Sequence, residues 1–141
     1  MLAAEKLLLR GVEDGVFPYA EWAVFGPDGI VRTGATEGGG GRWFDLASLT
    51  KTFTATALLG MVKAGKLYLA QSVGELLEPE SAKLRQYLDG ISLFSLMTHT
   101  SGLPAWYPFY ADGRPFFEAL EELLDCRGFG SGMVYSDLGY M

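Results

Sequence analysis

Several residue types are scarce in this chain of 141 residues, and each shortage narrows its chemistry. The single cysteine, Cys126, cannot form a disulfide within the chain, and the single histidine, His99, cannot build a histidine-rich metal site. The chain has no asparagine, and its only glutamines are Gln71 and Gln86. Such a depletion of heat-labile amides is typical of thermophilic sources, although compositional drift would produce it as well.

Basic residues and long apolar runs are scarce too. Eleven Lys and Arg face 17 Asp and Glu, giving a net charge of −6 without a basic cluster, so we expect no nucleic-acid binding. No apolar run is long enough to span a bilayer. Glu5 and Lys6 interrupt the apolar N-terminus, which we interpret as an amphipathic helix and not as a signal peptide. These features predict a cytoplasmic protein, or a periplasmic or extracellular one if a leader was removed.

The chain is rich in apolar residues, at 49%, and its length suits one domain with a core. We predict a helix over residues 2–14 and a hairpin of strands 19–25 and 30–36 around the turn "GPDG". A glycine-rich link, residues 38–41, leads to a long helix over residues 46–64. Four apolar residues at helical spacing predict a core face on this helix: Leu49, Phe53, Ala57 and Met61. Shorter helices are expected over residues 72–77, 92–98 and 115–124.

Ser48 and Lys51 stand three positions apart in "FDLASLTKTF", at the start of the predicted long helix. Residues at i and i+3 share a helix face, and the unpaired N–H groups of a first helical turn stabilise negative charge. A serine hydroxyl needs a nearby base to become a nucleophile, and a desolvated lysine can be that base. The pair is therefore either a polar helix start or a catalytic pair, and its spacing alone does not distinguish the two.

Three segments in order, "FDLASLTKTFTATALLGMVKAGKL", "SLMTHTSGLP" and "YSDLGYM", resemble the serine β-lactamase and penicillin-binding-protein superfamily. The likeness is strongest to its branch of class C β-lactamases, D,D-peptidases and esterases. The resemblance implies an α/β (α+β) fold, the N-terminal part of a β-lactamase/transpeptidase-like fold with helices packed on an antiparallel sheet. Residues 1–45 would form the N-terminal helix and hairpin of the sheet subdomain, and residues 46–141 the helical subdomain.

The resemblance also implies roles for individual residues. Ser48 matches the acylated nucleophile and Lys51 the lysine of the S-x-x-K motif, while Tyr135 matches the tyrosine that acts as general base and acid. Asp137 stands where the family usually has asparagine. An ionised Asp137 can only accept hydrogen bonds, and its charge favours the protonated form of Lys51. Tyr135 would then act as the general base, and ester substrates would be favoured over amides.

The family's third motif and second oxyanion N–H follow the tyrosine segment, on strands that we expect to be missing from this chain. "HTSG" mimics the third motif but precedes that segment, so we interpret His99 as a structural loop residue. An uncovered sheet edge predicts self-association or a complementing C-terminal chain. We expect the isolated chain to be a poor catalyst, because one lost oxyanion donor costs about 100- to 1,000-fold in rate.

Two functions therefore remain open. The first is a serine hydrolase that acts through an acyl–Ser48 ester on β-lactam, D-amino-acid peptide or small ester substrates, and needs no metal or organic cofactor. The second is a non-catalytic binding or assembly module. "GMVKAGKL" nearly matches a phosphate-binding loop, but it follows a helix and lacks the final hydroxyl, so nucleotide binding is not expected.

Overall fold

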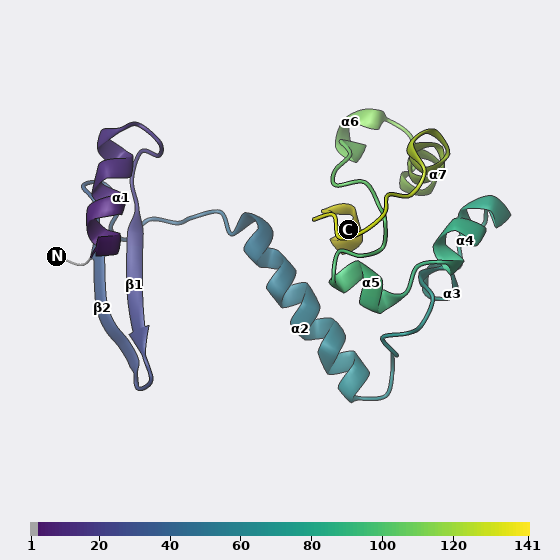
Figure 1. Ribbon diagram of the computed structural model, residues 1–141, viewed down its shortest axis with the longest axis horizontal. Coiled ribbons are helices and arrows are strands. Elements are labelled where there is room, and N and C mark those ends of the chain that lie inside the picture. Colours follow the sequence, from purple (N-terminus) through teal and green to yellow (C-terminus); the bar gives the residue numbers. More distant parts are fainter. Residues whose placement is uncertain (1–2) are drawn as a thin grey trace. The chain divides into compact units, whose positions relative to one another are not determined.

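Helices and one antiparallel hairpin make up the described chain, residues 3–141, in the computed structural model (Figure 1). The chain forms two compact units, Met1–Asp45 and Leu46–Met141. The first is called the N-terminal unit below and the second the helical unit. The fold is mixed α/β and corresponds to part of a β-lactamase-like fold, as the sequence predicts.

The N-terminal unit consists of helix α1 (Ala3–Glu13) and strands β1 (Glu21–Gly26) and β2 (Gly29–Ala35). The strands are antiparallel, with a bulge between Val24 and Phe25. Glu5 of α1 is buried and pairs with Arg32 of β2 at 2.8 Å, so α1 is fixed to the hairpin (Figure 1). The predicted helix and hairpin are confirmed, while Leu2 lies outside the described residues.

The helical unit begins with a 3₁₀ turn, η1 (Ala47–Leu49), and ends with another, η2 (Leu138–Tyr140). Between them lie α2 (Thr50–Lys63), α3 (Val73–Leu77), α4 (Ala82–Asp89), α5 (Leu93–Met97), α6 (Phe109–Asp112) and α7 (Phe116–Arg127). Three of these helices begin after serine caps whose hydroxyls accept a backbone N–H of the first turn: Ser72, Ser81 and Ser92. The sequence predictions missed α4, although Leu84 and Leu88 are at helical spacing on its buried face, and α6, which is only four residues long.

The core of the helical unit is aliphatic. Leu84 and Leu88 of α4 meet Leu120, Leu123 and Leu124 of α7 there. Val73, Ile91, Leu103 and Leu138 complete the cluster, so the core joins α3, α4 and α7 to the C-terminal segment.

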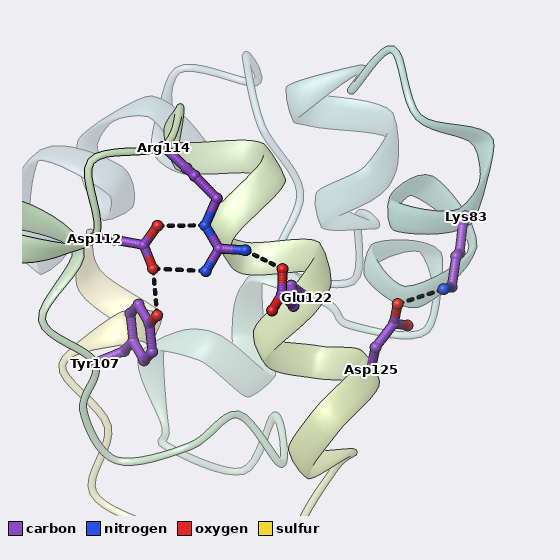
Figure 2. Close-up of polar contacts among 6 residues, drawn as sticks. All are labelled: Lys83, Tyr107, Asp112, Arg114, Glu122 and Asp125. Atoms are coloured by element: carbon purple, nitrogen blue, oxygen red, sulfur yellow. Dashed lines mark hydrogen bonds and ion pairs between the residues drawn. The ribbon is translucent and has the colours of Figure 1, made fainter.

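Polar contacts brace α7 at its surface (Figure 2). Arg114 Nε and Nη2 donate hydrogen bonds to the carboxylate of Asp112 at 2.5 and 2.8 Å. Arg114 Nη1 donates to Glu122 of α7. This pairing holds the pKa of Asp112 well below its usual range. Farther along α7, Asp125 binds Lys83 of α4. These bridges fix α7 to the loop before it and to α4.

The predicted core face of α2 is wrong for the helical unit taken by itself. Phe53 is 65% exposed, Leu49 and Met61 are also exposed, and no residue of α2 is buried. The core of this unit is built by α3, α4 and α7, so this stripe of α2 has no covering layer within the unit. Periodicity identifies an apolar face correctly, but it does not say which segment covers that face.

None of the helices among residues 3–141 combines the length and the apolar character needed to cross a bilayer.

Leu84→Ala should destabilise the helical unit by about 2–5 kcal/mol, because Leu84 is fully buried and its truncation leaves a cavity. Leu59→Ala, at a half-exposed position on α2, is the matched control and should change stability by less than about 0.5 kcal/mol. Urea denaturation followed by circular dichroism measures both. Equal losses for the two variants would contradict this assignment of the core.

Candidate active site

Ser48 lies in the η1 turn, directly before the first turn of α2. The preceding residue, Ala47, has φ +43°, a left-handed conformation that costs an L-residue about 1–2 kcal/mol. Lys51 Nζ donates a hydrogen bond to Ser48 Oγ at 3.1 Å. The proximity predicted from the spacing is therefore present, although Ser48 sits in a 3₁₀ turn and not in an α-helix.

Lys51 also forms an ion pair with Asp137, whose Oδ1 lies 2.5 Å from Nζ and 86 residues farther along the chain. The side chain of Lys51 is only 16% exposed. The hydrogen bond that Lys51 donates to Asp137 raises the pKa of Lys51 above its ordinary value, with a smaller contribution from Tyr135, while burial opposes the shift. Lys51 is therefore an ammonium group at neutral pH, and this ammonium bridges Ser48 and Asp137.

Two tyrosines surround the same ammonium group. Lys51 Nζ lies 5.1 Å from the ring centroid of Tyr135 and 5.8 Å from that of Tyr140, within the range of cation–π attraction. Tyr135 is 55% exposed, so an incoming molecule can reach it. The structure thus brings together all four residues proposed from the sequence: Ser48, Lys51, Tyr135 and Asp137.

The segment that carries Tyr135 and Asp137 is bonded to the loop that follows α5. The Asp137 amide donates to the Ala105 carbonyl at 2.8 Å, and the hydroxyl of Ser136 donates to the Pro104 carbonyl at 2.7 Å. Ser136 is fully buried, so its side chain points away from Lys51 into the unit. The loop therefore fixes residues 134–137 on the side away from Lys51.

His99 contacts this segment from within the same loop. Its Nδ1 accepts the backbone N–H of Ser136 at 3.1 Å, and its ring lies 4.5 Å from the ring of Tyr135 and 5.4 Å from that of Tyr140. Sequence reasoning treated His99 as a structural loop residue and missed these contacts. The "HTSG" segment did stand out in the sequence, but spacing gave no indication of its partner.

An open pocket of about 350 Å³ lies beside the site. It is lined by Ala47, Ser48, Thr50, Lys51, Thr54, Asp137, Tyr140 and Met141. A larger hollow of about 820 Å³ lies near the start of α7 and is rich in carboxylates. Its one hydroxyl side chain, Ser81, is hydrogen-bonded to Glu121, so the smaller pocket is the one that combines a serine with an ammonium group.

The β-lactamase family model matches residues 6–141, and the chain belongs to this family. An uncharacterized peptidase of Pasteurella multocida (strain Pm70) is 29% identical over 62% of this chain and 44% of its own length. An N-acetylmuramyl-L-alanine amidase of Bacillus subtilis (strain 168) is 31% identical over 70% of this chain and 25% of its own length. A β-lactamase of Providencia stuartii is 38% identical over 46% of this chain and 16% of its own length.

No solved structure matches the chain. The chain spans less than half the length of each of these three relatives, at 44%, 25% and 16%.

Asp137→Asn should lower the pKa of Lys51, because it removes the largest cause of the raised value. Lysine ¹³Cε signals followed through a pH titration measure this, with Lys51→Arg to identify the signal. Asp125→Asn is the matched control, since Asp125 is the largest cause of the raised pKa of Lys83. It should lower the pKa of Lys83 and leave that of Lys51 unchanged. An unchanged Lys51 titration in Asp137→Asn would contradict the pairing.

Linkage fixes the sign of the accompanying stability change. A raised lysine pKa contributes stability that is fully present below the ordinary lysine value and is lost as pH rises through the raised value. The stability of wild type should therefore exceed that of Asp137→Asn at neutral pH, and the difference should shrink at strongly alkaline pH.

Proposed function

We propose that this chain carries the nucleophile of a serine acyl-transfer hydrolase, with Ser48 forming a covalent acyl ester. The observation that supports this most directly is the bridging position of Lys51, which bonds Ser48 Oγ and Asp137 at once. The candidate substrates are β-lactams, D-amino-acid peptides and small esters.

In the proposed reaction, Ser48 Oγ attacks the carbonyl carbon of the substrate while the phenolate of Tyr135 takes the serine proton. Lys51 stays protonated throughout and stabilises that phenolate by its charge. The Ser48 backbone N–H stabilises the oxyanion, and Tyr135 then returns its proton to the leaving group. Water next attacks the acyl ester while Tyr135 takes its proton, and Tyr135 passes that proton to the departing Ser48 oxygen. The acid product leaves, and the Ser48 hydroxyl and the Tyr135 phenolate are restored.

Tyr135 is assigned as the base because Lys51 is already protonated and cannot accept a proton. The pairing with Asp137 raises the pKa of Lys51, and a group that is already an ammonium has no free lone pair. Tyr135 lies beside the same ammonium and is exposed to the incoming substrate. In this assignment of roles, Asp137 keeps Lys51 protonated.

The substrate class rests on two observations that point in different directions. The relatives are named peptidase, amidase and β-lactamase, and all three names denote action on amide bonds. Asp137, in contrast, offers a substrate only acceptor oxygens, one of which already binds Lys51. We therefore propose that small esters react faster than amides at Ser48.

A second candidate function is a non-catalytic binding or assembly module. The exposed apolar stripe of α2, which includes Phe53, favours it, because such a stripe is typical of a surface that another layer covers. The two candidates differ in whether Ser48 reacts.

Incubation with a fluorophosphonate probe should add one adduct mass to the wild-type chain, as the Ser48 oxygen bonds to phosphorus and fluoride leaves. Ser48→Ala should abolish the adduct, while Ser131→Ala, which removes another exposed serine, should keep it. Tyr135→Phe should slow labelling by about 100- to 10,000-fold, since it removes the proposed base. Intact-mass spectrometry measures each rate. A folded wild-type chain without an adduct, or Ser48→Ala labelled at the wild-type rate, would exclude the acyl-transfer proposal.

The module proposal predicts association through α2. Phe53→Glu places a charge in the centre of the exposed stripe and should shift the chain toward monomer. Lys63→Glu, in the last turn of the same helix, places a carboxylate outside the stripe with a larger change in net charge, and is the control. Light scattering after size-exclusion chromatography measures the mass. A wild-type chain that is already monomeric at high concentration would contradict this prediction.

A further inference from the structure

His99 has a backbone conformation that few residues adopt, together with a side chain that bonds a distant segment. Its φ is +58°, in the left-handed region where asparagine, aspartate and histidine are enriched among residues other than glycine. From this conformation its carbonyl accepts the Val134 N–H at 3.0 Å and its Nδ1 accepts the Ser136 N–H at 3.1 Å. One residue thus binds two alternate amides of the segment that carries Tyr135.

We infer that His99 is a positioning residue: its neutral ring, protonated on Nε2, holds the Ser136 amide and thereby places Tyr135 and Asp137 against Lys51. Its effect on catalysis rests on the function proposed above, whereas its effect on geometry does not. His99 itself has no described contact with Ser48 and is not assigned to the chemistry.

The position of Ser136 explains why the hydrogen bond to His99 matters beside the bonds that Asp137 and Ser136 make to the loop. Ser136 stands between Tyr135 and Asp137, so fixing its amide fixes the backbone from which both side chains project toward Lys51. The His99 ring also lies against Tyr135 and Tyr140, the two rings that face the Lys51 ammonium. The hydrogen bond fixes the backbone position of the segment. The ring contacts fix the orientation of the Tyr135 and Tyr140 rings.

The hydrogen bond also defines the tautomer of the ring. An imidazole nitrogen accepts a backbone N–H only when it carries no proton of its own, so the neutral ring must hold its proton on Nε2. The Lys51 ammonium that faces the two tyrosine rings is paired with the Asp137 carboxylate.

Two substitutions separate the roles of His99. His99→Asn keeps an acceptor, since Oδ1 is attached to Cγ as Nδ1 is, and asparagine tolerates a positive φ; it loses the ring. His99→Gly keeps the backbone conformation and loses both the acceptor and the ring. Comparing the two isolates the acceptor at a position where the backbone stays unstrained.

The first measurement needs no activity. His99 is the only histidine of the chain, so its ring ¹⁵N signals are unambiguous, and long-range ¹H–¹⁵N spectra should show the Nε2–H tautomer. Hydrogen exchange of the Ser136 amide should be slow in wild type and in His99→Asn, and roughly three- to tenfold faster in His99→Gly. A ring protonated on Nδ1, or equal exchange in all three proteins, would overturn the inference.

The second measurement is the labelling rate of Ser48 by the fluorophosphonate probe. Displacing Tyr135 by an ångström should slow it by about 100-fold in His99→Gly, and His99→Asn should recover most of the loss. Circular dichroism confirms that each variant is folded. If wild type is labelled and His99→Gly is labelled at the same rate, the positioning role in catalysis is overturned. Absence of labelling in wild type would instead defeat the proposed function and leave the exchange and tautomer results to decide the geometry.

Discussion

The ion pair between Lys51 and Asp137 connects the start of α2 to the last residues of the chain, and the arrangement of the site depends on it. The 85 residues between the two partners contain α3, α4 and α7, which build the core of the helical unit. The pair keeps Lys51 charged, and that charge holds Ser48 on one side and the tyrosine rings on the other. The geometry around Ser48 is thus tied to a long-range contact of the fold.

Features set by local spacing could be predicted from the sequence. The contact between Ser48 and Lys51 follows from their i, i+3 relation, and the hairpin follows from its turn. Features that need a partner from elsewhere could not. The apolar stripe of α2 was predicted as core because periodicity is blind to what covers a face, and the role of His99 depends on a backbone amide 37 residues away. The resemblance placed Tyr135 and Asp137 near Lys51, whereas spacing alone did not.

The hairpin and α2 both expose apolar side chains that no other element of their own unit covers. The described sheet has two strands, and such a sheet is marginally stable in water without further strands or a packed helix. Phe25 and Val31 of the hairpin and Phe53 of α2 are exposed. The candidate site is therefore combined here with surfaces that favour contact with additional polypeptide.

The carboxylate at position 137 changes which residue of the site can carry a proton. With an amide there, Lys51 would have a neutral neighbour and its amine form would be accessible near neutral pH if it were desolvated. With Asp137, desolvation is outweighed by a hydrogen-bonded countercharge, and the ammonium form prevails. A fixed ammonium cannot exchange protons with Ser48, but it can stabilise an anion next to it. Tyr135 is one of the two tyrosines beside this ammonium, and the His99 ring lies against it. The substitution therefore makes the site depend more strongly on the position of one phenol.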